Sequence, residues 1–140
     1  MNKDFVSFEI AKKLKEKGFE CDHPFAMYSE EGVFYDLCTS AKYITSASGF
    51  KCRCYYDYED FDEHDCVAPT ISQVLKWLRE EKKLFVEIFM YHSCYLYEIY
   101  NTEIYDVDFT QKSEKYSEEE YASYEQAALA GIEYAIDNLL

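Results

Sequence analysis

Residues 70–109 read TISQVLKWLREEKKLFVEIFMYHSCYLYEIYNTEIYDVDF, and the spacing of the apolar residues changes once within this stretch. At first they recur at steps of three and four, as at Ile71, Val74 and Leu78, which is the spacing of an amphipathic helix. From Leu84 onward the period becomes two, which is typical of strands. The stretch therefore predicts a helix followed by an antiparallel sheet.

The predicted helix spans residues 70–83 and has a well-marked start. Thr70 and Gln73 form a capping box, in which each side chain accepts a hydrogen bond from the backbone of the other, and Pro69 stands just ahead of it. Because Trp77 lies beside the apolar stripe, we expect its ring on the buried face of this helix.

A three-stranded meander is predicted over residues 84–109. The pairs at residues 92–93 and 101–102 suit hairpin turns, so the third strand should begin at Ile104. Aromatic residues occur on both faces of the meander. This pattern predicts either that both faces are partly covered or that one of them is a docking surface.

A last helix is predicted over residues 117–138, with Ser117 and Glu120 as a second capping box. Small residues around Gly131 should let it approach the sheet closely. The order helix, three strands, helix resembles the topology of a double-stranded-RNA-binding domain, which implies RNA binding through lysines at the start of the last helix. Glutamates occupy residues 118–120 here, so the charge argues against RNA.

The N-terminal part of the chain predicts a helix and a hairpin. The helix spans residues 7–17, with Ser7 as its N-cap and Gly18 just beyond its end. The hairpin spans residues 25–38, and Gly32 in its turn is free to take a positive φ.

The middle of the chain is less regular. Residues 39–50 are rich in Ser, Ala and Thr and predict a loop, with a helical turn as the alternative, whereas residues 51–56 predict one more strand. An acidic loop follows at residues 57–65. The whole pattern predicts a single α+β domain, residues 1–140, in which an antiparallel meander is flanked by helices.

The charge of the chain limits its partners. Its 28 acidic and 14 basic residues give a formal net charge of -14. This excess opposes direct binding to nucleic acids and to anionic membranes, and it favours either solubility alone or a basic protein partner. The first 17 residues lack an apolar core and no apolar run approaches the roughly 20 residues of a membrane span, so we expect a cytoplasmic protein.

The six cysteines are expected to be thiols in a reducing cytosol. Cys52, Cys54, His64 and Cys66 are four soft ligands within fifteen residues, and such ligands can hold zinc in a tetrahedron. The single residue between Cys52 and Cys54 is shorter than the usual zinc-knuckle spacing. We therefore weigh a zinc site against ordinary buried or surface thiols.

The acidic loop is the predicted partner-binding segment, because its carboxylates alternate with aromatic rings that can anchor a basic partner. The residues proposed for this role are Tyr56, Tyr58, Glu59, Asp60, Phe61 and Asp62.

The sequence predicts neither a catalytic residue nor a cofactor site. His92 stands beside Cys94, but no local nucleophile motif surrounds them, and a histidine in an exposed turn explains the pair. The four glycines are isolated, which disfavours a glycine-rich phosphate loop.

Three segments, residues 5–18, 68–80 and 124–140, resemble a group of small uncharacterised proteins of phages and mobile elements from anaerobic gut bacteria. The sequence APTISQVLKWLRE at residues 68–80 is the most distinctive of the three. The resemblance implies a bacterial or phage cytoplasm and an accessory gene, and it brings no activity or ligand.

Three hypotheses follow. The first is a non-enzymatic protein of a mobile element that binds another protein. The second is a DNA mimic, whose carboxylates replace phosphates on a nucleic-acid-binding protein. The third is a small zinc module or enzyme. A homodimer through the tyrosine-rich sheet is a further alternative.

Overall fold

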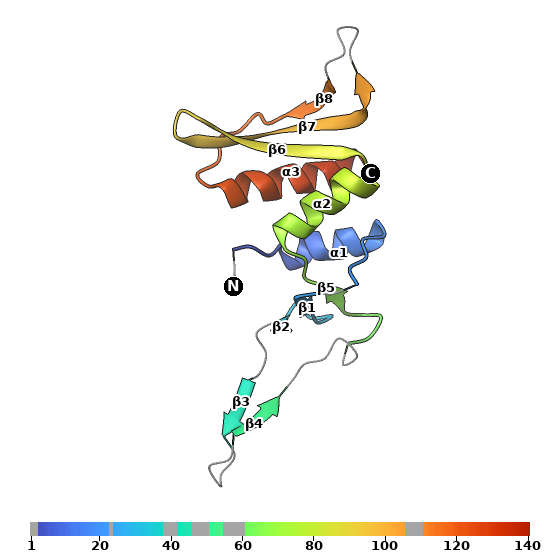
Figure 1. Cartoon of the computed structure of the whole chain (residues 1–140), viewed down its shortest axis with the longest axis vertical. Coiled ribbons are helices and arrows are strands. Elements are labelled where there is room, and N and C mark those ends of the chain that lie inside the picture. The colour runs from blue at the N-terminus through green and yellow to red at the C-terminus, as the bar shows by residue number, and fades with distance from the viewer. Residues whose placement is uncertain (1–2, 23, 38–41, 46–50, 55–60, 106–110) are drawn as a thin grey trace. The chain divides into compact units, whose positions relative to one another are not determined.

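The computed structural model describes residues 3–22, 24–37, 42–45, 51–54, 61–105 and 111–140 (Figure 1). The predicted α+β class is confirmed, because helices combine with small antiparallel sheets. The contacts divide the chain into two compact units. One comprises Ser7–Pro69, and the other combines Asn2–Val6 with Thr70–Leu140. That residues 1–140 act as one domain stays a prediction.

The C-terminal unit contains a three-stranded antiparallel sheet in the order β6-β7-β8, with two helices on one face (Figure 1). Its elements are α2 (Ile71–Glu81), β6 (Leu84–Tyr91), β7 (Cys94–Tyr105), β8 (Gln111–Tyr116) and α3 (Tyr124–Asn138). His92 and Ser93 form the tight turn between β6 and β7, both with positive φ, as a two-residue hairpin turn requires.

The face of the sheet that carries Val86 and Ile99 is buried under the two helices. These two residues are cross-strand partners, and both are shielded from solvent. A Cβ added to Gly131 of α3 would lie 2.8 Å from Val86 Cγ1 and 3.1 Å from Tyr97 Cγ. Glycine is therefore what permits the close approach of α3 to the sheet.

The start of α2 is as predicted. The backbone N–H of Gln73 donates to Thr70 Oγ1 at 3.1 Å, and the Thr70 N–H donates to Gln73 Oε1 at 2.9 Å. The expected burial of Trp77 is met only in part. Its side chain is intermediate in exposure, with Lys82 Nζ 5.2 Å from the ring centroid, whereas Leu78 is fully buried.

The predicted turn at residues 101–102 is wrong, because β7 continues through it to Tyr105. Asn101 pairs with Leu84, and the Thr102 N–H donates to the Lys83 carbonyl, so both residues stay in the ladder. The third strand consequently begins at Gln111 instead of Ile104.

The last helix begins later than predicted, with Ser123 as its N-cap. The Ser123 side chain accepts a hydrogen bond from Gln126 N. Ser117 is buried instead at the end of the sheet, where its N–H donates to the Tyr97 carbonyl and its Oγ accepts from Tyr97 N. Pairing with β7 therefore displaces the expected capping box.

The N-terminal unit contains one helix and two small sheets. Its elements are α1 (Phe8–Glu16), β1 (Ala26–Tyr28), β2 (Phe34–Asp36), β3 (Lys42–Thr45), β4 (Lys51–Cys54) and β5 (Cys66–Val67), with sheet orders β2-β1-β5 and β3-β4. Ser7 caps α1 as predicted. Gly32 takes a φ of 84° in the predicted hairpin.

The loop predicted for residues 39–50 needs one correction. Lys42–Thr45 forms β3, which pairs antiparallel with β4 in the register Ile44 to Cys52. The β-branched residues Ile44 and Thr45 favour this extended conformation. The predicted strand at residues 51–56 is observed as Lys51–Cys54.

Candidate functional site

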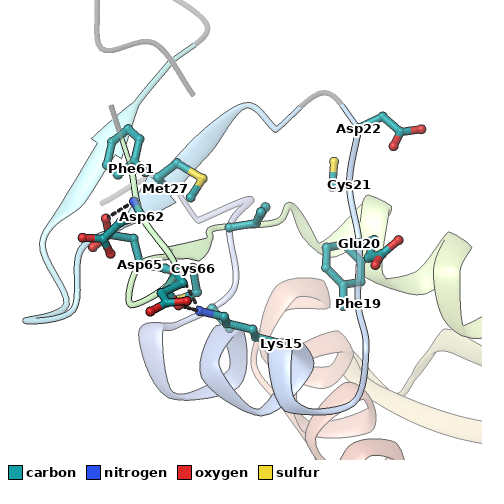
Figure 2. Close-up of a pocket in the computed structure, with 13 residues that line it drawn as sticks. Lys15, Phe19, Glu20, Cys21, Asp22, Met27, Phe61, Asp62, Asp65 and Cys66 are labelled. Carbon is teal, nitrogen blue, oxygen red and sulfur yellow. Dashed lines mark hydrogen bonds between the residues drawn. The ribbon is translucent and has the colours of Figure 1, made fainter. Parts of the chain in front are cut away.

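A hollow of about 660 Å³ lies within the N-terminal unit and is our candidate site (Figure 2). Figure 2 shows residues 19–22 on one side of it and the segment from Phe61 to Cys66 on the other. The described residues that line it are Ala11, Lys15, Phe19, Glu20, Cys21, Asp22, Met27, Phe61, Asp62, Glu63, Asp65, Cys66 and Val67.

One wall of the hollow is a tight turn that its own carboxylates shape. Asp65 Oδ2 accepts from the Asp62 N–H at 3.0 Å, and Asp65 Oδ1 accepts from the Glu30 N–H at 3.0 Å. Asp62 Oδ1 accepts from the His64 N–H at 2.8 Å. The side chains of Asp62 and Asp65 therefore stabilise the turn in addition to contributing negative charge to the hollow.

Lys15 projects from α1 to the same turn. Its ammonium donates to the Asp65 carbonyl at 2.8 Å and to the Glu63 carbonyl. Two backbone carbonyls thus accept hydrogen bonds from the ammonium. Lys15 is the single basic residue in the described lining, against five carboxylates, which leaves an excess of four negative charges.

The floor of the hollow is apolar. Met27 and Cys66 are buried there, and the Phe61 ring lies 5.6 Å from the ring of Tyr35. Burial raises the pKa of the Cys66 thiol, against the opposing effect of Lys15. The thiol therefore stays protonated near neutral pH, which does not suit a nucleophile.

The predicted zinc ligands are only partly described. His64 is exposed and Cys66 is buried, while the side chains of Cys52 and Cys54 on β4 lie outside the described part of the structure. Within that described part, no group of three or more His, Cys, Asp or Glu side chains is placed to hold a metal ion. The zinc site stays a prediction.

Of the predicted partner-binding residues, Phe61 and Asp62 line the hollow. Tyr56, Tyr58, Glu59 and Asp60 lie outside the described residues.

Sequence reasoning missed the opposite wall of the hollow, residues 19–22, and the role of Lys15. No sequence signal joins Lys15 to a turn about fifty residues away, because its spacing also fits a solvated lysine face.

The second cysteine considered for chemistry, Cys94, lies outside this unit. Partial burial and a hydrogen bond to Glu120 raise the pKa of the Cys94 thiol. The ring of His92 stacks edge-on against Tyr91 with centroids 4.2 Å apart. Neither feature activates a nucleophile.

Comparison with known proteins leaves the site without a precedent: no family model, curated protein or solved structure matches the chain. Among the described residues, no helix has the length and apolar character needed to cross a membrane.

Proposed function

We propose that this is a non-enzymatic protein that binds a basic segment of a partner protein in the hollow. One observation carries the proposal: five carboxylates and a single ammonium surround an apolar floor. A lysine or arginine side chain has the matching form, because its methylene stem can lie on apolar surface while its charged end stays near carboxylates.

The arrangement discriminates among ligands by charge. An excess of negative charge in a concave site raises the local concentration of cations and repels phosphates and carboxylates. An acidic peptide, a nucleotide or a nucleic acid is therefore a poor ligand. The resemblance to proteins of mobile elements is consistent with an accessory protein of this kind.

The test uses synthetic peptides that carry lysine or arginine beside apolar residues, with binding measured by calorimetry at low and high ionic strength. The variant Glu20→Gln/Asp22→Asn removes two charges from the wall that has no part in shaping the Asp62–Asp65 turn. We expect binding to weaken about tenfold, which is ~1.4 kcal/mol.

The matched control is Glu16→Gln/Glu31→Gln, which changes the net charge equally on exposed residues outside the lining. Equal losses of peptide affinity in the variant and in the control would show that only the overall charge matters, and this result would overturn the proposed site. Failure of every basic peptide to bind at low ionic strength would do the same.

DNA mimicry is a more specific form of the same idea, in which the partner is a nucleic-acid-binding protein. Once a partner is known, competition decides between the two. Double-stranded DNA should displace a mimic from its target, with strong salt dependence by analogy with phosphate contacts.

A further inference from the structure

The sheet β6-β7-β8 has a second face, opposite the one that α2 and α3 cover. Cross-strand register places residues of all three strands on it, since neighbours two apart along a strand share a face. The residues on this face that matter here are Phe85, Glu87, Phe89, Glu98, Tyr100 and Tyr116.

Two carboxylates stand together at the centre of this face. Glu87 and Glu98 are direct cross-strand partners, and like charges in that position destabilise a sheet. Neither forms an ion pair with a cation among the described residues. The sheet therefore carries a local repulsion that a positive charge from outside the unit would relieve.

Aromatic rings flank the two carboxylates. The rings of Phe89 and Tyr116 lie 5.9 Å apart, and Tyr116 is half-exposed. A hydrogen bond to the Glu98 carboxylate, together with burial and nearby charges, raises the pKa of Tyr100. The Tyr100 phenol therefore stays protonated near neutral pH, and register places it on the same face as Glu98.

We propose that this face binds an arginine-bearing segment of a partner protein, with the guanidinium at Glu87 and Glu98 and the neighbouring rings stacked on its plane. Arginine fits better than lysine because its planar fork can bond two carboxylates and its face stacks on aromatic rings. The proposal rests on charge complementarity at this face and is independent of the hollow.

A second copy of the chain is a poorer occupant. Two such faces in contact would bring four carboxylates together, and like charges at an interface cost several kcal/mol. Electrostatic repulsion between the carboxylates therefore disfavours self-association through this sheet.

The experiment measures binding of an arginine-containing peptide and of its lysine counterpart to the full chain at low ionic strength. We expect tighter binding of the arginine peptide, and a loss of about tenfold in Glu87→Gln/Glu98→Gln. The same variant should have a higher melting temperature, because the cross-strand repulsion is gone. A rise in stability with a loss of binding distinguishes lost recognition from lost folding.

The matched control is Glu80→Gln/Glu81→Gln, an equal charge change on the exposed side of α2. The proposal would be overturned if the control and the variant changed peptide affinity equally. It would also be overturned if the arginine and lysine peptides bound with the same affinity. A dimer in sedimentation that the Glu87→Gln/Glu98→Gln variant strengthens would overturn it too. A loss that follows Glu20→Gln/Asp22→Asn instead would assign the peptide to the hollow and would also overturn it.

Discussion

Gly18 and Gly32 have the same backbone conformation in different surroundings, and they make a matched pair. Both have a φ of 84°, which L side chains rarely adopt. An added Cβ would meet nothing within 4 Å at Gly18, but at Gly32 it would lie 2.8 Å from Cδ1 of Phe8. We expect Gly18→Ala to lower the free energy of unfolding by about 1 kcal/mol and Gly32→Ala by about 2–4 kcal/mol.

Urea unfolding of the two variants measures this difference. Equal losses would show that the Phe8 ring moves aside at little cost, and that the hairpin turn is not packed against α1.

Tyr97 should make stability depend on pH in the alkaline range. Burial, neighbouring hydroxyls and nearby carboxylates raise its pKa from 10.0 to about 12. Below pH 10 the phenol is protonated in both states, so its contribution is fully present. As the pH rises through 12, the unfolded chain ionises first and stability falls.

The check is the melting temperature of wild type and Tyr97→Phe between pH 9 and pH 12. The variant should lose less stability over this range. It should still lose some, because Tyr28 and Tyr121 also have raised pKa values. Parallel curves would mean that Tyr97 ionises in the folded state as it does in the unfolded chain.

At the scale of elements, two adjacent residues of α2 differ in how deeply they are buried. Leu78 is fully buried, whereas Trp77 keeps part of its ring in solvent. A carboxylate at Leu78 would be buried without a partner, so Leu78→Asp should cost more than about 3 kcal/mol. Trp77→Asp should cost about 1 kcal/mol.

Chemical denaturation, monitored by circular dichroism, measures the free energy of unfolding of both variants. Lys76→Asp on the exposed side of α2 is the control for charge and helix propensity. A larger loss for Trp77→Asp than for Leu78→Asp would mean that the other side of α2 faces the sheet.

The sequence predicted elements well where one local signal acted alone. The capping box at Thr70 and the turn at residues 92–93 appear as expected. It failed where local signals compete with pairing. Ser117 followed by Glu120 satisfies the capping pattern, yet hydrogen bonds to Tyr97 place Ser117 at the sheet. Such bonds join residues twenty apart and leave no periodic trace in the sequence.

For the candidate site, the sequence predicted less. It singled out Phe61 and Asp62 by the mixture of rings and carboxylates. It missed residues 19–22, which line the same hollow and precede β1, the strand that pairs with β5. Strand pairing over about forty residues is decided by the packing of the whole unit, so no spacing rule could supply it.

At the scale of the whole molecule, the net charge of -14 should make the fold sensitive to ionic strength. Ion pairs of the described residues such as Lys12 with Glu9 and Lys115 with Glu118 are solvent-exposed on at least one side. Exposed pairs contribute little, roughly 0–1 kcal/mol each. Repulsion among the carboxylates should therefore outweigh them, and it is screened within about 10 Å at 0.1 M salt.

We accordingly expect the melting temperature to rise as potassium chloride is added to a dilute buffer at neutral pH. Chloride is the suitable anion, because sulfate strengthens apolar burial in any protein and would give the same sign for another reason. Most of the rise should come at low concentration, where screening changes fastest. A melting temperature that falls with chloride would show that attractive pairs dominate, and it would weaken the view that the surface carries unneutralised charge for a basic partner.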